Sequence, residues 1–137
     1  KINYMSKDLN FIKLNKKYDI ILMLEIIEHL ENWETIVSKI LNCLKPKGKI
    51  IFSTINRTLY ARIFAIFLAE EILRIIPKET HHYNKLIKPT ELHNFLKNNN
   101  MNILDTTGLV FNPLNNEWYL NKKRIRINYF CTAQKLN

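Results

Sequence analysis

Two carboxylates and an imidazole lie close together in the first part of the chain. Glu25, Glu28 and His29 directly follow the apolar run Tyr18–Leu24. Carboxylate and imidazole groups can hold a divalent cation, and hard oxygen donors favour Mg²⁺. The same group can instead perform acid–base chemistry, with the His29 imidazole as the acid or base and a carboxylate orienting it. A structural interpretation also stands, because acidic residues before a helix stabilise its positive end.

A second polar group follows the next apolar run. Ser53–Arg57 (STINR) offers hydroxyls, an amide and a guanidinium. Open α/β sheets bind ligands beyond the C-terminal ends of their strands, so this segment and Glu25–His29 can line one cleft. The alternative is capping and loop hydrogen bonding, which these residue types perform in many proteins.

The elements that position these groups form a strand–helix–strand unit. Tyr18–Leu24 is too short and too apolar for an amphipathic helix and predicts a strand buried on both faces. Lys49–Ile55 predicts a second buried strand. Asn32 is the expected N-cap of the helix between them, and Lys45–Gly48 its expected stop. The apolar stripe of that helix consists of Trp33, Ile36, Val37, Ile40, Leu41 and Leu44.

The remaining elements complete an α/β fold. Lys88–Glu91 opens a helix, and Asn102–Phe111 and Arg126–Ala133 read as strands separated by the turn Asn112–Asn116. The apolar face of this helix comprises Leu92, Phe95 and Leu96. The order β, α, β, α, α, β, β predicts a parallel sheet that ends in an antiparallel hairpin.

Leu59–Ile76 predicts a helix that Pro77 ends. Its centre, Ala61–Ala69, is apolar almost all round, but the segment is too short and too charged to span a membrane. Two interpretations remain open. The helix packs over the sheet, or its phenylalanine and isoleucine side chains enter a bilayer interface beside Lys and Arg.

The charge and the cysteines exclude several classes of protein. The net charge of +9 comes mostly from scattered Lys residues, and the compact basic cluster lies at Lys122–Arg126. This Lys-, Asn- and Ile-rich composition is typical of an AT-rich genome, so we expect no nucleic-acid partner. Cys43 and Cys131 show neither metal-site spacing nor a disulfide framework.

The chain also carries a series of motifs in a defined order. They are Tyr18–Leu30, Leu44–Gly48, Phe52–Arg57, Ala69–Lys78, Thr80–His81, Ile87–Leu92, Thr107–Leu109, Phe111–Pro113 and Ile127–Tyr129. In order and spacing, along essentially all 137 residues, they resemble the ubiquinone biosynthesis O-methyltransferase family.

This resemblance implies a Rossmann-like class I fold that uses S-adenosylmethionine for both O-methylations of polyprenylated catechol intermediates of ubiquinone. It implies that Leu24 contacts the cofactor and that Glu25, Glu28 and His29 bind Mg²⁺. The segment Leu59–Pro77 corresponds to a membrane-binding helix. The implied partners are the prenylated catechol, anionic membrane lipid and a ubiquinone-biosynthesis complex. The implied location is cytoplasmic, peripheral on the inner face of the cell membrane.

One feature of such enzymes is missing. They begin with a strand and a Gly-rich cofactor loop, whereas Lys1–Met5 already corresponds to the third strand of the fold, and Gly48 and Gly108 are the only glycines. We therefore expect a domain that is incomplete at its N-terminus and inactive alone. The alternatives are another small-molecule methyltransferase of this fold and a non-catalytic truncated remnant. The catalytic base, the prenyl length and the oligomeric state are not predicted.

Overall fold

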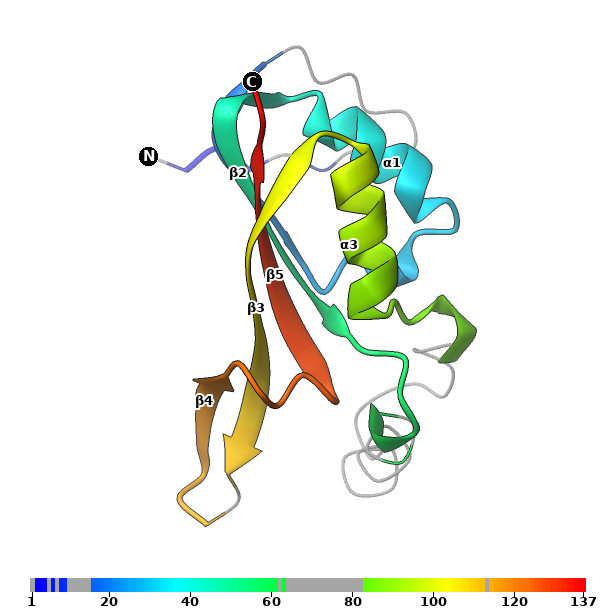
Figure 1. Ribbon diagram of the computed structural model, residues 1–137, viewed down its shortest axis with the longest axis vertical. Helices are drawn as coiled ribbons and strands as arrows, with labels where there is room; N and C mark the ends of the chain where they lie inside the picture. The colour runs from blue at the N-terminus through cyan, green and yellow to red at the C-terminus, as the bar shows by residue number, and fades with distance from the viewer. Residues whose placement is uncertain are drawn as a thin grey trace.

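The computed structural model describes residues 2–4, 6, 8–9, 16–61, 63, 83–112 and 114–137. A five-stranded mixed sheet in the order β1-β2-β5-β3-β4 forms one layer, and the helices α1 and α3 pack together on one of its faces (Figure 1). The elements in chain order are β1 (Tyr18–Leu24), η1 (Ile27–His29), α1 (Trp33–Leu41), β2 (Leu44–Ile55), η2 (Tyr83–Lys85), α3 (Pro89–Asn98), β3 (Met101–Asn112), β4 (Glu117–Asn121) and β5 (Asn128–Lys135).

The predicted strand–helix–strand unit is confirmed. β1 and β2 are parallel, with Ile20 opposite Lys49 and Leu24 opposite Ser53. The helix between them begins after Asn32, as expected, although the Asn32 side chain makes no capping hydrogen bond. Four residues of the predicted apolar stripe are buried against the sheet, namely Ile36, Val37, Ile40 and Leu41.

β2 begins earlier than the sequence suggested. Leu44, predicted at the end of the helix, lies in the strand and pairs with Tyr18, and the next pair along is Ile20 with Lys49. The residues between Leu44 and Lys49 therefore bulge out of the ladder, and Lys47 takes a left-handed φ of 59° there. The helix ends at Leu41, before the predicted helix stop at Lys45–Gly48, and that segment is instead an irregularity within one continuous strand.

The prediction that β1 is buried on both faces is also wrong. β1 lies at the edge of the five-stranded sheet, and successive side chains alternate between its faces. Met23 points to the helix side and is 2% exposed, whereas Ile20 and Leu22 on the other face are 58% and 56% exposed. α1 and α3 cover only one face, so the apolar run has one buried side.

The C-terminal half contains the expected antiparallel pairing and one unexpected strand. β5 lies between β2 and β3 and is antiparallel to both, with a bulge in β3 between Ile103 and Asp105. β4 was not predicted. It forms a hairpin with β3, with residues 114–116 in a turn before it, so the predicted turn leads into β4 and not directly to β5.

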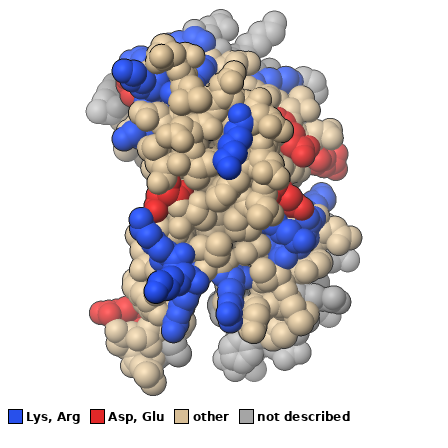
Figure 2. Space-filling model, in the orientation of Figure 1, with Lys and Arg blue, Asp and Glu red and all other residues tan. Residues whose placement is uncertain are grey.

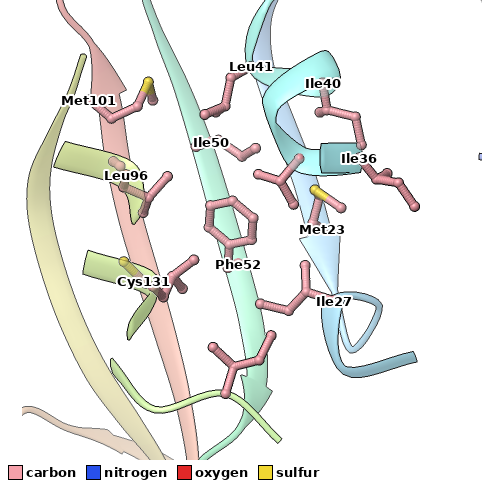
Figure 3. Packing of buried hydrophobic residues seen from close by; sticks show 14 of the residues in the cluster. Met23, Ile27, Ile36, Ile40, Leu41, Ile50, Phe52, Leu96, Met101 and Cys131 are labelled. Carbon is pink, nitrogen blue, oxygen red and sulfur yellow. The ribbon is translucent and has the colours of Figure 1, made fainter. Parts of the chain in front are cut away.

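A single hydrophobic core fills the space between the sheet and the two helices. Phe52 of β2 lies at its centre, with Met23 and Ile27 on one side and Leu96 and Cys131 on the other (Figure 3). The predicted face of α3 is confirmed, since Leu92 and Leu96 are fully buried and Phe95 packs at the margin.

Two expectations concern segments that are only partly described. Residues 2–4 form no strand, and Ile2 and Tyr4 are largely exposed, so the assignment of Lys1–Met5 to a strand is wrong for its described part. A strand needs a hydrogen-bonded neighbour, and none pairs with residues 2–4 in the described sheet.

Of the expected helix Leu59–Ile76, residues 59–61 and 63 are helical, and the rest with Pro77 lies outside the described residues. Within the described ranges, no helix combines the length and apolar character that a membrane crossing requires.

Candidate functional site

The two polar segments singled out in the sequence meet where β1 and β2 end. The strands are parallel neighbours, so their C-terminal ends lie at the same edge of the sheet. Leu24, the last residue of β1 and the predicted cofactor contact, sits beside Ser53 and is 44% exposed. This edge therefore presents an accessible apolar side chain next to a row of hydroxyls and carboxylates.

Glu25 is fixed at this edge by Ser53. Its backbone takes the left-handed φ of 52°, which is uncommon for a residue other than glycine. The Glu25 amide donates to the Ser53 carbonyl oxygen at 3.0 Å and to Ser53 Oγ at 3.1 Å. In return Ser53 Oγ donates to Glu25 Oε1 at 2.7 Å. These reciprocal bonds hold the carboxylate in one position while leaving it exposed.

Glu28 lies in the opposite environment. It sits in the 3₁₀ turn η1 with 3% of its surface exposed, and Thr54 Oγ1 donates to its Oε2 at 2.9 Å. Its other oxygen, Oε1, is buried without a hydrogen-bond partner. Burial raises the pKa of the Glu28 carboxyl from 4.5 to about 7, and the negative charge of Glu25 adds to that rise. A buried carboxyl group, with only one of its two oxygens hydrogen-bonded, thus lies at the ends of the two strands.

The structure does not assemble the predicted three-ligand metal set. His29 follows Glu28 but is exposed, because successive residues of a 3₁₀ turn point about 120° apart. Across the described ranges, no group of three His, Cys, Asp or Glu side chains is arranged to hold a metal ion. Glu25 and Glu28 contact the neighbouring residues Ser53 and Thr54 of β2, whereas His29 is exposed.

The side chains of the second polar segment, Ser53–Arg57, contact two different parts of the molecule. Ser53 and Thr54 contact the carboxylates, as expected for a shared edge. Asn56 instead turns toward the residues before β5 and donates through Nδ2 to the Ile125 carbonyl oxygen at 2.7 Å. Arg57 forms an ion pair with Glu91 at the start of α3. Of Ser53–Arg57, Ser53 and Thr54 therefore meet Glu25 and Glu28, and that the segment lines a ligand cleft stays a prediction.

Sequence reasoning missed Tyr129 of β5, which lies opposite Thr54 and is fully buried. Its hydroxyl donates to the Ile87 carbonyl oxygen at 3.0 Å. Burial raises the pKa of Tyr129, and the negative charge of Glu28 contributes to the rise. In the sequence Tyr129 looked like any apolar residue of an alternating strand. Its place beside the site follows from the pairing of β2 with β5, which no local pattern reveals.

The sheet, the helices on one of its faces and the polar strand ends correspond to part of a class I methyltransferase fold. A family model described as a methyltransferase domain matches residues 3–106, and the chain belongs to that family. Its curated relatives carry a narrower name. Proteins called ubiquinone biosynthesis O-methyltransferase from Rickettsia typhi and Rickettsia bellii are 43% and 40% identical to it over 100% and 98% of its residues. The resemblance seen in the motifs is thereby confirmed.

The chain spans 56% of the length of each of these two relatives. Among solved structures, a methyltransferase from Thermotoga maritima matches 90% of the chain and 60% of its own length, with a TM-score of 0.66 at 14% identity. The N-methyltransferase NodS from Bradyrhizobium japonicum, solved in complex with S-adenosyl-l-homocysteine, matches 96% of the chain and 53% of its own length, with a TM-score of 0.60 at 10% identity. At such identities the likeness shows the fold alone, and it confirms the predicted class.

Proposed function

We propose that the whole protein transfers methyl groups from S-adenosylmethionine to catechol hydroxyls of polyprenylated ubiquinone precursors, in both O-methylation steps. The observation that carries this proposal is the identity of about 40% with the ubiquinone biosynthesis O-methyltransferases, which runs along 98–100% of the chain. The polar edge formed by β1 and β2 is where such a sheet binds its ligands.

The donor, when bound, supplies a sulfonium methyl group that is open to attack by oxygen. That chemistry would exchange the S–C bond of the donor for an O–C bond to the substrate, with the hydroxyl proton released to a base or to solvent. The described residues contribute to the reaction by positioning the reactants. Leu24 offers an apolar contact for the cofactor, and Ser53 fixes the Glu25 carboxylate beside it. Precise placement of two reactants supplies much of the acceleration of such a transfer.

We further propose that Mg²⁺ binds at this edge, with Glu25, Glu28 and His29 as its ligands. The unpartnered Glu28 Oε1 supports the proposal, because a buried carboxylate oxygen without a hydrogen bond is a suitable donor to a cation. The three side chains do not fit a metal ion in their present arrangement, since the described ranges contain no three-residue ligand cluster.

We also propose a location in the cell and binding partners for the protein. The resemblance of the segment Leu59–Pro77 to a membrane-binding helix supports peripheral contact with anionic lipid on the inner face of the cell membrane. A ubiquinone-biosynthesis complex is a further proposed partner. The physical reason is that a prenylated catechol partitions into lipid, so an enzyme that touches the bilayer reaches its substrate there.

The activity is tested with the full-length protein, S-adenosylmethionine and two catechols, one prenylated and one not. We expect methylated product from the prenylated catechol, detected by mass spectrometry as a gain of one methyl group per step. Equal turnover of both catechols would favour another small-molecule methyltransferase. No product from either would refute the proposal.

The metal proposal has its own test. The variant Glu28→Gln keeps the shape of the side chain and removes its charge, and Glu34→Gln on the exposed side of α1 is the matched control. We expect Mg²⁺ to raise the thermal unfolding temperature of the parent chain and of Glu34→Gln but not that of Glu28→Gln. An equal effect of Mg²⁺ on all three proteins would end the metal proposal, whatever the activity.

A further inference from the structure

β4 forms a margin of the described sheet. It is the last strand in the order β1-β2-β5-β3-β4, and Figure 1 shows it on the outer side of a hairpin that projects from the body. All of its residues pair with β3 along one edge. Along the other edge, no strand of the described residues pairs with it. Alternate N–H and C=O groups of an outermost strand point away from the sheet, so this edge can bind a further strand.

Two cross-strand apolar pairs lie together on one face of this hairpin. Leu109 is opposite Leu120, and Phe111 is opposite Trp118 with the ring centroids 5.1 Å apart. Directly opposed residues share a face of an antiparallel pair, and so do residues two positions apart on one strand. Trp118 and Leu120, the two members on β4, are 56% and 64% exposed. The chain therefore presents exposed apolar side chains beside a strand edge that the described residues leave open.

The order of residues in β4 suits pairing with a second copy of the same strand. Tyr119 is the central residue, with Trp118 before it and Leu120 after it. If two β4 strands pair antiparallel about a two-fold axis at Tyr119, each Trp118 lies opposite the partner's Leu120. An apolar row then crosses both hairpins through Leu109, Leu120, the partner's Trp118 and the partner's Phe111. Symmetry produces the same row a second time, so the surface is complementary to itself.

The charges at the two ends of β4 favour the same alignment. The strand begins at the exposed Glu117 and is followed by the exposed Lys122 and Lys123. Figure 2 shows acidic atoms at the outer margin of the hairpin and basic atoms where the hairpin joins the body. Lysines near an edge strand oppose pairing where they meet one another. In the antiparallel alignment the lysines of the two chains lie at opposite ends, and each basic end meets an acidic one.

We propose that two copies of the chain associate edge to edge through β4, antiparallel and with Tyr119 at the two-fold axis. The two sheets become one continuous sheet across the axis. Backbone hydrogen bonds between the two strands supply the attraction, as in other cases of strand addition to an open edge. The apolar rows set the register, because a slip of one residue would place the apolar side chains of the two chains on opposite faces. Lys122 already pairs with Asp105 of its own chain, so Lys123 is the cation that we assign to the partner's Glu117.

This association surface is separate from the edge formed by Glu25, Glu28 and Ser53, and it goes beyond the proposed function. It rests on the β3–β4 hairpin alone. A protein that dimerises through β4 and transfers no methyl group would refute the proposed activity and leave this inference standing.

The first experiment tests the register with single cysteines in the full-length protein. Opposed residues of antiparallel strands have Cα atoms about 4.5–5.5 Å apart, a separation that a disulfide can span. Under mild oxidation we therefore expect Tyr119→Cys to form a covalent dimer on a non-reducing gel. Glu117→Cys should not link to itself, because its two copies lie about 14 Å apart along the strands. A mixture of Glu117→Cys and Asn121→Cys chains should link, since these positions are opposed.

The native Cys43 and Cys131 are buried, and the parent protein treated in the same way is the control for other cysteines. Failure of Tyr119→Cys to link, or equal linking of Tyr119→Cys and Glu117→Cys, would overturn the proposal.

The second experiment measures the dissociation constant of the dimer by analytical ultracentrifugation. Leu120→Ala should weaken the dimer about tenfold, because symmetry counts each lost cross-strand contact twice. Leu136→Ala, at an exposed leucine outside the hairpin, is the matched control and should have no effect. Glu117→Lys should also weaken the dimer, since lysine would then meet lysine, whereas Glu34→Lys on the exposed side of α1 should not.

Circular dichroism establishes that each variant is folded, which is expected because the altered side chains are exposed or half-buried. A full-length protein that remains monomeric at every concentration would overturn the proposal. So would a dimer that the hairpin variants and their controls weaken equally, because its interface would then lie elsewhere on the molecule.

Discussion

Replacing Glu28 with glutamine should stabilise the chain at alkaline pH and change its stability little at acidic pH. The carboxyl is 3% exposed, and its burial raises its pKa from 4.5 to about 7. Below about pH 4.5 the group is protonated in both the folded and the unfolded chain, so it adds no pH dependence there. As the pH rises, the unfolded chain releases this proton first, and the free energy of unfolding falls until the folded chain releases it too.

The size of this effect follows from the shift. A rise from 4.5 to about 7, at about 1.4 kcal/mol for each pKa unit, corresponds to a loss of up to about 3 kcal/mol above pH 7. Glutamine removes the ionisation and keeps the contact with Thr54, because its amide oxygen can accept the hydrogen bond that now reaches Oε2. Its NH₂ group replaces the unpartnered Oε1, so one unsatisfied polar atom is exchanged for another at every pH.

The assay is urea unfolding at about pH 5 and about pH 8 in chelating buffer, with Glu34→Gln as the control at an exposed position. We expect Glu28→Gln to gain up to about 3 kcal/mol over the parent at the higher pH and much less at the lower. A gain of equal size at both pH values would refute the reasoning, because the difference would then not come from ionisation. A parent chain with a higher free energy of unfolding than Glu28→Gln at pH 8 would refute it as well.

Three further substitutions test the packing around the site. Gly108→Ala should cost about 1–3 kcal/mol or more, since its Cβ would lie 1.8 Å from the Arg124 carbonyl oxygen, and urea unfolding measures the loss. Tyr129→Phe should cost about 1–2 kcal/mol because the buried Ile87 carbonyl loses its donor, and an unchanged urea midpoint would contradict that account. Leu96→Ala should cost about 2–5 kcal/mol, as a fully buried core residue is truncated, with a thermal transition lowered accordingly.

The helices were predictable because their signal is local. The apolar stripe from Ile36 to Leu41 and the pair Leu92 and Leu96 repeat at helical spacing, and each becomes a buried face. Strand burial depends on neighbours elsewhere in the chain, so the run Tyr18–Leu24 did not reveal that one of its faces is open. β4 was missed because its five residues are nearly all exposed and show no alternation of buried and open positions.

The candidate site was located from sequence for a similar reason. Glu25 and Ser53 follow two neighbouring parallel strands, and strand ends of that kind meet at one edge of a sheet. The spacing of these residues in the sequence does not show which side chains are buried and which are exposed. Glu28 is buried and His29 exposed because the turn that carries them is a 3₁₀ turn, and the left-handed backbone of Glu25 sets where that turn begins.

The position of β5 in the sheet has a consequence for how the chain acquires its structure. Among the described strands β5 comes last in the chain, yet it separates β2 from β3 and pairs with both. The β1–β2 pair and the β3–β4 hairpin share no ladder with each other in the described sheet, so they are joined through β5 alone. A chain growing on the ribosome makes Asn128–Lys135 after the other strands, and until then two separate β-ribbons expose edges that can pair wrongly. The described sheet should therefore be completed only once Asn128–Lys135 has left the exit tunnel, and a nascent chain stalled before Asn128 should be a target for chaperones.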